Sequence, residues 1–509
     1  MTKQDRLIAA GLSFFSFILC GIRYWFPGEA YFDEVYYPKS ALEYLTNQPQ
    51  FEWTHPPLTK MLIALSMLLF GGAHSALGNT GWGWRFLNVV VGALTVYLLY
   101  AFVKRITNST RFAAIGAGLL IVDGFHFTQA RIATPEITVA FFCLAMLYAF
   151  YVYWERITVL PEPPELPVRQ LLYLGIGSIV AAWIAGYGIV GMVFHQTHGA
   201  PQLIAALTMF GVYAIGRIVI AKPPALKELV ILAIVCGLGA ASKWNTIFDL
   251  MLILAFAGGI ALLPRPNRRL PLDAFVAIVM GTTIAIYLAF YAPFFASKQP
   301  VTFQNGNNLT GLMDLQNQMF TYHDVTVANM KPHPYSSKWW EWPILYQPVS
   351  YWYHDTRTGA QAADPRACCI TEILSLPNPI TWWSGLLTVP FMGWLAWRKR
   401  NRAYFLLFCA YFAQWLPWIA SPRMLFQYHF FPNDAIILIA DTIALQQLWE
   451  WGKRGSENRF EWVKTGVWCY MVAAITAFIF FYPVLAGDYV NYATWQSRMW
   501  FPHWIVGPG

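Results

Sequence analysis

Charged residues are scarce in this chain, and their scarcity excludes most soluble folds. Only 12% of the 509 residues are Asp, Glu, Lys or Arg, whereas about a quarter of the residues of a soluble domain are charged. Low-complexity tracts are absent as well, which argues against a disordered chain. Hydrophobic residues make up 57% of the sequence. The composition therefore predicts a polytopic integral membrane protein.

Cysteine pairs and metal-binding motifs are also scarce. The chain has seven Cys, and only Cys368 and Cys369 lie in a polar segment. The others lie in apolar stretches, where Cys behaves as a small hydrophobe. Since adjacent cysteines rarely form a structural cross-link, we predict no disulfide framework. The sequence has no Asp-x-Asp pair, and we expect neither a metal ion nor another cofactor.

Long apolar runs are what the chain has in abundance. A helix needs about 20 apolar residues to cross a bilayer, and on this measure the sequence predicts an all-α bundle of about 11–13 transmembrane helices. The candidate spans are 7–26, 84–106, 111–128, 135–154, 171–193, 201–220, 227–242, 246–263, 272–294, 379–397, 402–420, 433–451 and 463–485. Segment 57–71 is apolar but too short to span, so we expect a short helix there.

The basic residues indicate the topology. The net charge is +8, and Lys and Arg gather in short loops such as 398–402, which the positive-inside rule places in the cytoplasm. The N-terminus is then cytoplasmic, whereas the C-terminus and the long loops 27–83 and 295–378 are non-cytoplasmic. Because the basic clusters mark the cytoplasmic edge, we expect no nucleic-acid partner. We divide the chain into an N-terminal transmembrane module (1–294), an outer loop (295–378) and a C-terminal module (379–509).

Two adjacent acids follow the first predicted span. Asp33 and Glu34 lie in the first outer loop beside the aromatic residues Tyr31, Phe32 and Tyr36. A carboxylate in apolar, partly dehydrated surroundings is a candidate general base or electrostatic stabiliser. The alternative is an acid pair that only caps the following helix.

Several cationic side chains fall at the predicted outer edge, where the phosphate of a lipid lies. Guanidinium groups bind phosphate through two parallel hydrogen bonds. The candidates for binding a lipid phosphate or its sugar are Arg85, Arg131, His55, Lys243, Arg423 and His429. The alternatives are a salt bridge of Arg131 with Glu136 or Asp123, a rigid turn at His55, and simple snorkelling of Lys243.

The segment 333–353 in the second long loop is rich in aromatic residues. We expect Trp339, Trp340 and Trp342 to form a platform for an acceptor or a sugar. The alternative is an anchor at the membrane–water interface, where Trp is enriched.

Taken in order, these segments resemble the protein O-mannosyltransferase family, including its bacterial members. The matching segments are FDEVYYPKSALEYL (32–45), HPPLTKMLIAL (55–65), WRFLNVVVGALTVYLLY (84–100), DGFHFTQARIATPEI (123–137), SKWN (242–245), HPYSSKWWEWPILYQPVSYWY (333–353) and YHFFP (428–432). The chain departs from the family at Ala130-Arg131 and Glu136, where Ser-Arg and Asp are common. It also lacks the long insert of eukaryotic members.

The resemblance implies a C-type glycosyltransferase fold with its active site on the non-cytoplasmic side. Such an enzyme moves mannose from polyprenyl-phosphate mannose to Ser or Thr hydroxyls of secreted polypeptides, with inversion and without a nucleotide sugar. By motif match, Asp33 is the catalytic acid residue, Glu34 assists, and Arg85 is the family arginine that opens the second span. The expected partners are the lipid-linked donor, the acceptor polypeptide and membrane lipids.

Two alternatives stay open. One is a lipid-carrier-dependent glycosyltransferase that acts on a lipid or a cell-wall glycan. The other is a membrane transporter or flippase, a class in which charged sites and broken helices occur at mid-membrane depth. Here the charged clusters fall at the outer edge instead.

Overall fold

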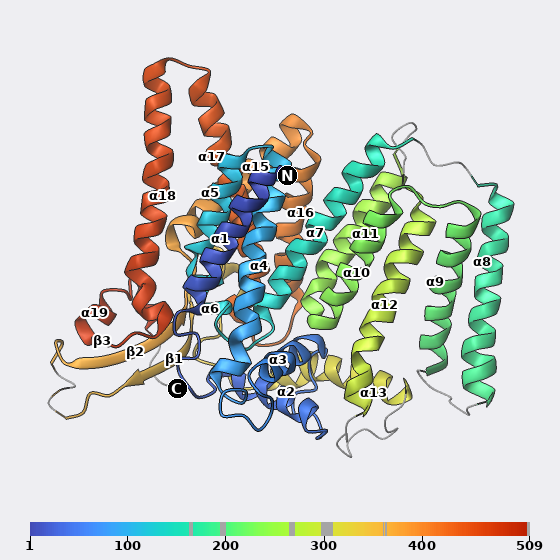
Figure 1. Ribbon diagram of the computed structural model, residues 1–509, viewed down its shortest axis with the longest axis horizontal. Helices are drawn as coiled ribbons and strands as arrows, with labels where there is room; N and C mark the ends of the chain where they lie inside the picture. The colour runs from blue at the N-terminus through green and yellow to red at the C-terminus, as the bar shows by residue number, and fades with distance from the viewer. Residues whose placement is uncertain are drawn as a thin grey trace. The chain divides into compact units, whose positions relative to one another are not determined.

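Helices dominate the computed structural model (Figure 1), as the apolar runs predict. The structure describes residues 1–161, 166–193, 200–263, 270–296, 309–359, 361 and 364–505. Its α-helices are α1 (Lys3–Gly21), α2 (Tyr37–Leu45), α3 (Leu58–Leu69), α4 (Gly81–Thr107), α5 (Thr110–Ile121), α6 (Gly124–Gln129), α7 (Glu136–Val159), α8 (Val168–Trp183), α9 (Ala200–Ile220), α10 (Leu226–Ser242), α11 (Ile247–Ala261), α12 (Leu272–Ala296), α13 (Leu309–Thr321), α15 (Pro379–Lys399), α16 (Arg402–Trp415), α17 (Pro432–Lys453), α18 (Glu457–Ala486) and α19 (Tyr492–Gln496).

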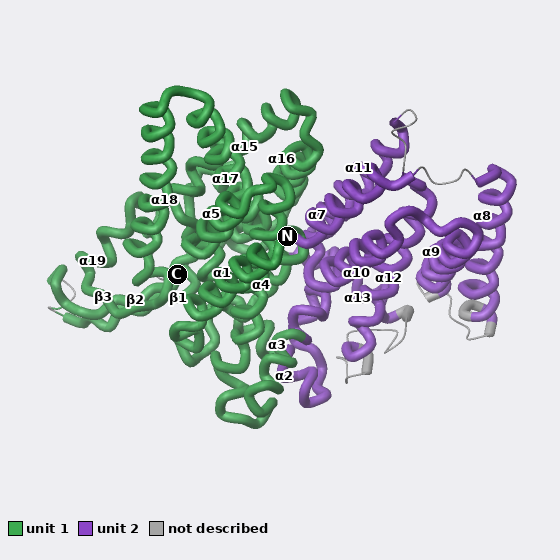
Figure 2. Tube along the Cα trace, turned by 45° about the horizontal axis from the view of Figure 1, so that its top comes forward, with its two compact units in different colours: residues 1–39, 62–144, 327–509 green, residues 40–61, 145–326 purple. Residues whose placement is uncertain are grey.

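The chain folds into two units, which Figure 2 shows in different colours. Unit 1 comprises residues 1–39, 62–144 and 327–509, and unit 2 comprises residues 40–61 and 145–326. In unit 1, α1 packs on α4, α4 packs on α5, and α17 packs on α5, α15 and α18. In unit 2, α12 packs on α9, α10 and α11.

Eight helices in the described part of the chain are long and apolar enough to cross a membrane. They are Gly81–Thr107, Glu136–Val159, Val168–Ile189, Pro201–Ile220, Trp244–Ala261, Leu272–Phe294, Arg402–Ala420 and Glu457–Ala486. The short apolar helix expected near 57–71 is confirmed as α3.

The predicted span 111–128 is wrong. Helix α5 has only 12 residues and ends at Ile121, too few to cross a bilayer at 1.5 Å per residue. Asp123 interrupts the run, because its carboxylate accepts the N–H groups of Phe125 (2.7 Å) and His126 (3.0 Å) and so begins the separate helix α6.

Close packing of helices in unit 1 depends on small residues. A Cβ atom placed on Gly385 of α15 would lie 2.7 Å from Cγ2 of Ile437 in α17. Glycine therefore lets these two backbones approach, as small residues do where membrane helices meet.

A small antiparallel sheet departs from the predicted all-α fold. Strands β1 (Val349–Asp355), β2 (Cys368–Ser375) and β3 (Val490–Asn491) pair in the order β1-β2-β3. Val349 pairs with Ser375, and Ile370 pairs with Val490. The sheet therefore joins the predicted outer loop 295–378 to the tail of the chain. A pairing partner so distant in the sequence leaves no local signal.

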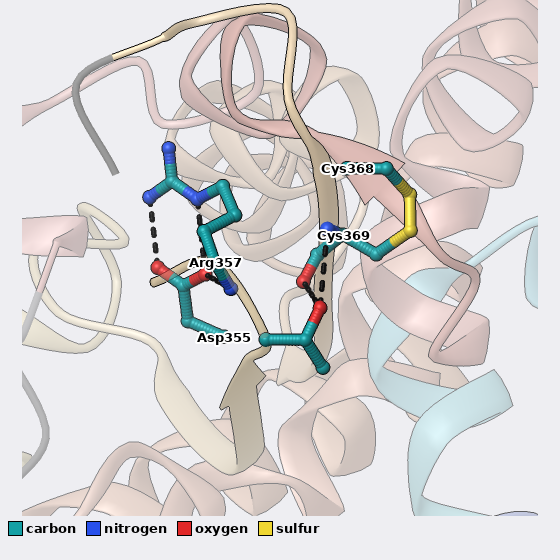
Figure 3. Close-up of a disulfide and its surroundings, with 5 residues drawn as sticks. Asp355, Arg357, Cys368 and Cys369 are labelled. Carbon is teal, nitrogen blue, oxygen red and sulfur yellow. Dashed lines mark hydrogen bonds and ion pairs between the residues drawn. A yellow bond between two sulfur atoms is a disulfide. The ribbon is translucent and has the colours of Figure 1, made fainter. Parts of the chain in front are cut away.

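The expectation of no disulfide is wrong for one pair, because Cys368 and Cys369 are bonded to each other at the start of β2 (Figure 3). Adjacent side chains of a regular strand point to opposite faces. The register of β2 against β3 shifts between Cys368 and Ile370, so regular alternation is lost here. Thr356 closes the β1–β2 connection on Cys369, whose N–H donates to Thr356 Oγ1 and whose carbonyl accepts from it.

Candidate active site

Glu34 and Arg85 form a buried ion pair in unit 1. Arg85 Nε donates to one carboxylate oxygen of Glu34 and Nη2 to the other, each at 2.7 Å. Arg85 is fully buried, and Glu34 is 1% exposed. The remaining N–H groups of Arg85 donate hydrogen bonds to the carbonyls of Tyr24, Pro27 and Glu29. All five guanidinium donors are thus used within the chain.

This geometry argues against the role expected for Arg85. A phosphate would need guanidinium N–H groups that are already donated to Glu34 and to backbone carbonyls. Arg85 instead fixes residues 24–34 against α4, and the salt bridge that was the alternative for an outer arginine is what forms here. Glu34 is likewise enclosed, because its carboxylate also accepts the N–H of Ala133 at 2.7 Å. It positions the loop rather than facing a substrate.

Asp33 lies on the other side of the same short turn. The 3-10 helix Phe32–Val35 turns Glu34 inward and leaves Asp33 half-buried. Phe32 has φ of 50°, a left-handed conformation that is costly for a residue with a side chain. Its ring packs against Tyr351 with centroids 4.6 Å apart. The turn that carries Asp33 is therefore held in place by the ion pair on one side and by an aromatic contact on the other.

Two buried tyrosines lie beside the turn that carries Asp33, because the rings of Tyr351 and Tyr428 are 4.6 Å and 6.0 Å from the ring of Phe32. Burial raises the pKa of Tyr351 well above its usual range, and the charges of Glu136 and Asp33 raise it further. Burial raises the pKa of Tyr428 in the same way, with added contributions from Asp33 and Glu136. Gln129 Nε2 donates to the Tyr351 hydroxyl at 2.6 Å. Both tyrosines stay protonated at neutral pH, so each can donate an O–H beside the two carboxylates.

Arg131 supports the structure of unit 1. It is 5% exposed, and its Nη2 donates to the carbonyls of Ile22 (3.0 Å) and Arg23 (3.1 Å) at the end of α1. A cation at a helix C-terminus is stabilising. The Nη1 atom of Arg131 is buried without a hydrogen-bond partner among the described residues, and the predicted contact of Arg131 with a lipid phosphate stays a prediction.

The aromatic segment divides between core and surface. Trp342 is 1% exposed, its Nε1 donates to Ser337 Oγ at 3.0 Å, and its ring stacks on His429 at 6.3 Å. His429 is also 1% exposed. These two residues are buried in the core, and their expected roles in binding a sugar or phosphate stay predictions. Trp340 is half-exposed, at 50%, and Trp339 is partly exposed.

A second polar cluster lies in unit 2 around His55. Lys60 is 1% exposed, and its Nζ donates to Glu52 Oε2 (2.7 Å) and to the carbonyl of His55 (2.8 Å). His55 Nδ1 lies 3.0 Å from Glu52 Oε1. Burial opposes the ionisation of Glu52, yet Lys60 and His55 hold the pKa of that carboxyl well below its usual range. The cluster orients the His55 ring, which packs 5.0 Å from the ring of His323.

Lys243 lies in unit 2, where it ends α10. Its N–H donates to the carbonyl of Gly239, and the residue is 7% exposed. The next residue, Trp244, donates its Nε1 to the Tyr287 hydroxyl at 3.1 Å. Arg423 lies in unit 1, and its charge acts on Tyr428.

Sequence reasoning missed four residues of these two clusters. The sequence marks Glu136 only as a partner for Arg131 and as a departure from the family, and it does not single out Tyr351, Glu52 or Lys60. An acid at the outer end of a predicted span was a signal for Glu136. No pattern in the sequence pairs Glu52 with Lys60, because their contact depends on the path of the intervening turn.

Two family models match this chain. Residues 10–162 match the model of the dolichyl-phosphate-mannose-protein mannosyltransferases, and residues 308–504 match the C-terminal four-helix region of protein O-mannosyltransferase. The polyprenol-phosphate-mannose–protein mannosyltransferase of Mycobacterium tuberculosis is 26% identical over 94% of this chain and 87% of its own length.

Two solved structures share the fold. The Saccharomyces cerevisiae protein O-mannosyltransferase Pmt1–Pmt2 complex, bound to its sugar donor, gives a TM-score of 0.70 at 13% identity over 99% of this chain and 93% of that chain. ArnT from Cupriavidus metallidurans, bound to undecaprenyl phosphate, gives 0.52 at 11% identity over 95% and 76%.

The helical bundle and the two family models define a membrane-bound glycosyltransferase of the C-type fold. Within that class, the two family models together cover more than half of the sequence, and the chain belongs to the protein O-mannosyltransferase family. It is an enzyme, a mannosyltransferase. A transporter or flippase is thereby excluded.

Proposed function

We propose that this enzyme takes mannose from polyprenyl-phosphate mannose and transfers it, with inversion, to Ser or Thr hydroxyls of polypeptides on the non-cytoplasmic face of a membrane. The single observation that carries the proposal is the placement of Asp33. It is the half-buried carboxylate of an acid pair whose other member, Glu34, is fixed by Arg85. The mycobacterial relative carries the same donor and acceptor class in its name.

The reaction needs one base and one stabilised leaving group. The acceptor hydroxyl oxygen forms a bond to C1 of mannose while the bond between C1 and the phosphate oxygen breaks. Asp33 accepts the hydroxyl proton, because an aliphatic hydroxyl is a weak nucleophile without a base. Polyprenyl phosphate leaves as an anion with its lipid chain.

Side-chain donors replace a metal ion in this proposal. Tyr351 and Tyr428 can donate hydrogen bonds to sugar or phosphate oxygens, since their high pKa keeps them protonated. Arg423 is a further cationic candidate for the donor phosphate, and the roles predicted for His55 and Lys243 stay predictions. Such preorganised donors stabilise charge most effectively in a partly dehydrated site.

The decisive variant is Asp33→Asn, which keeps the shape of the side chain but removes the proton acceptor. We expect transfer of labelled mannose to a Ser/Thr peptide to fall by about 10²–10⁴-fold, with an unchanged unfolding temperature. Asp364→Asn, which removes the same charge from an exposed position, serves as the matched control. Near-normal transfer by Asp33→Asn contradicts the assignment. Transfer only to a lipid or glycan acceptor would keep Asp33 as the base and change the acceptor class.

A further inference from the structure

An open groove lies in unit 1 beside the acid site. It encloses about 550 Å³ between two segments, residues 328–347 and residues 418–425. The backbone N–H of Ser337 donates to the carbonyl of Leu425 at 2.9 Å, which joins the two segments. We call this surface the Trp340 groove, after the half-exposed indole on its rim.

Aromatic rings on rigid supports line the Trp340 groove. Trp418 is buried to 6% exposure. The backbone of Trp339 is fixed by a hydrogen bond, because Trp415 Nε1 donates to its carbonyl at 2.8 Å. Lys338 Nζ lies 4.9 Å from the centre of the Trp340 ring. Each of these aromatic residues thus has a contact within the chain, and such contacts lower the entropy cost of binding.

Charged groups give the groove a polarity that a hydrocarbon chain would not match. Lys338 is exposed, Arg423 is partly buried, and both line the groove together with Glu341. The Glu341 carboxylate already accepts the N–H of Lys338 at 2.7 Å. The lining thus combines aromatic faces with two cations that can bind carbonyl or carboxylate oxygens of a ligand.

The segment that lines one side of the groove leads directly to the acid site. Leu425 lines the groove, and the ring of the next residue, Phe426, stacks on Tyr428 with centroids 5.2 Å apart. The Tyr428 ring lies 6.0 Å from the ring of Phe32, the residue before Asp33. A polypeptide in the groove therefore lies near the turn that carries the proposed base.

We propose that the Trp340 groove binds the residues flanking the acceptor hydroxyl of an extended polypeptide. Aromatic-lined grooves are a recurring means of holding extended peptide segments, whose backbone leaves carbonyl groups available to cations. An open groove also suits an acceptor residue in the middle of a chain, since the polypeptide continues beyond both ends. This inference rests on the proposed function.

The test compares two acceptors with purified full-length protein and polyprenyl-phosphate mannose. One is a long peptide with a single central Thr, and the other is N-acetyl-threonine amide, which has no flanking residues. Trp340→Ala should raise the KM for the long peptide about tenfold relative to that for the amide, while the donor KM stays constant. Trp340→Phe should recover most of the loss. Trp394→Ala, which removes an equally exposed indole (51%) from α15, is the control and should change neither KM.

The other outcomes would contradict either the groove proposal or the proposed function. Equal effects of Trp340→Ala on both acceptors, or a raised donor KM, would overturn the proposal. If the unmutated protein transfers mannose to no peptide, the proposed function fails, and direct binding then tests the groove by itself. A fluorescent long peptide with Ala in place of Thr should bind about tenfold more weakly to Trp340→Ala, and equal binding would refute the groove.

Discussion

Two neighbouring acidic side chains in the first loop differ in burial. Asp33 and Glu34 are adjacent acids in the sequence, yet Glu34 is enclosed by Arg85 and the N–H of Ala133, whereas Asp33 stays half-buried. The buried acid is neutralised by two parallel hydrogen bonds from one guanidinium, which is the strongest geometry for such a pair. Of this acid pair, Asp33 is the member that is not enclosed.

Removal of Arg85 should therefore affect folding before it affects donor binding. Arg85→Ala leaves the Glu34 carboxylate buried without its cation, a change that costs about 3–5 kcal/mol. We expect a markedly lower unfolding temperature for the purified protein. The double variant Glu34→Gln, Arg85→Ala should be less destabilised than the two single effects predict together, because the two residues interact directly.

Kinetic measurements on the correctly folded protein test whether Arg85 binds the donor phosphate. If Arg85 only positions the loop, the donor KM of correctly folded Arg85→Ala should stay close to that of the unmutated enzyme. A normal unfolding temperature combined with a raised donor KM would return Arg85 to the role of phosphate ligand.

Among the secondary-structure elements, the outer sheet is the one whose strand pairing local sequence patterns predict least well. Strand β2 takes its partners from β1 and from the two-residue strand β3 near the end of the chain. Its Glu372 is 4% exposed, and Trp495 Nε1 of α19 donates to its carboxylate at 2.6 Å. Burial raises the pKa of Glu372 to about 7, against the hydrogen bonds from Ser350 and Trp495. The sheet and the tail helix thus enclose a carboxyl group that prefers to be neutral.

This carboxyl should make stability depend on pH. The pKa of Glu372 is raised from 4.5 to about 7 on folding, so the folded state holds the proton more tightly than the unfolded state. Its contribution is fully present below pH 4.5 and is lost as the pH rises through about 7. At 1.36 kcal/mol per unit, the loss is about 3 kcal/mol.

Glu372→Gln isolates this effect, because the amide oxygen can still accept from Trp495. The variant and the unmutated protein should unfold alike near pH 4, and the variant should be more stable at pH 8. Thermal unfolding of both proteins at the two pH values measures the difference. If the difference in stability between the two proteins is the same at both pH values, folding does not raise the pKa of Glu372.

For the whole molecule, the bilayer acts as the solvent that selects the architecture. Helices satisfy their own backbone hydrogen bonds, which is why they can cross a hydrocarbon layer. The placement of Lys and Arg then orients the helices across the membrane. We expect loops 27–83 and 295–378 on the non-cytoplasmic side and residues 398–402 on the cytoplasmic side.

Cysteine labelling tests that orientation. In a variant without native cysteines, Lys331→Cys should react with a membrane-impermeant maleimide on intact cells. Arg398→Cys should react only after the membrane is permeabilised; both positions are exposed in the structure. The reverse pattern would place the proposed active site in the cytoplasm and contradict the topology.

The sequence by itself determined that the protein is a helical membrane protein and which family it resembles. Apolar runs and basic clusters are linear properties, and the bilayer acts on them segment by segment. The motif around Asp33 and Glu34 likewise located the candidate site. Even so, the run 111–128 shows the limit of this reasoning, since the carboxylate of Asp123 ended a helix inside an apolar stretch.

Only the tertiary structure decided which of the candidate residues are buried in the core and which stay exposed. Arg85 and Glu34 are 51 positions apart, and their pairing depends on how the first loop returns to α4. Trp340 and Trp342 belong to one aromatic segment, yet Trp340 is half-exposed and Trp342 is buried. Residue type and spacing indicate which chemistry a side chain can perform. Burial and hydrogen-bond partners, however, come from contacts between distant segments. Those contacts determine whether a charged or aromatic group supports the fold or acts on a substrate.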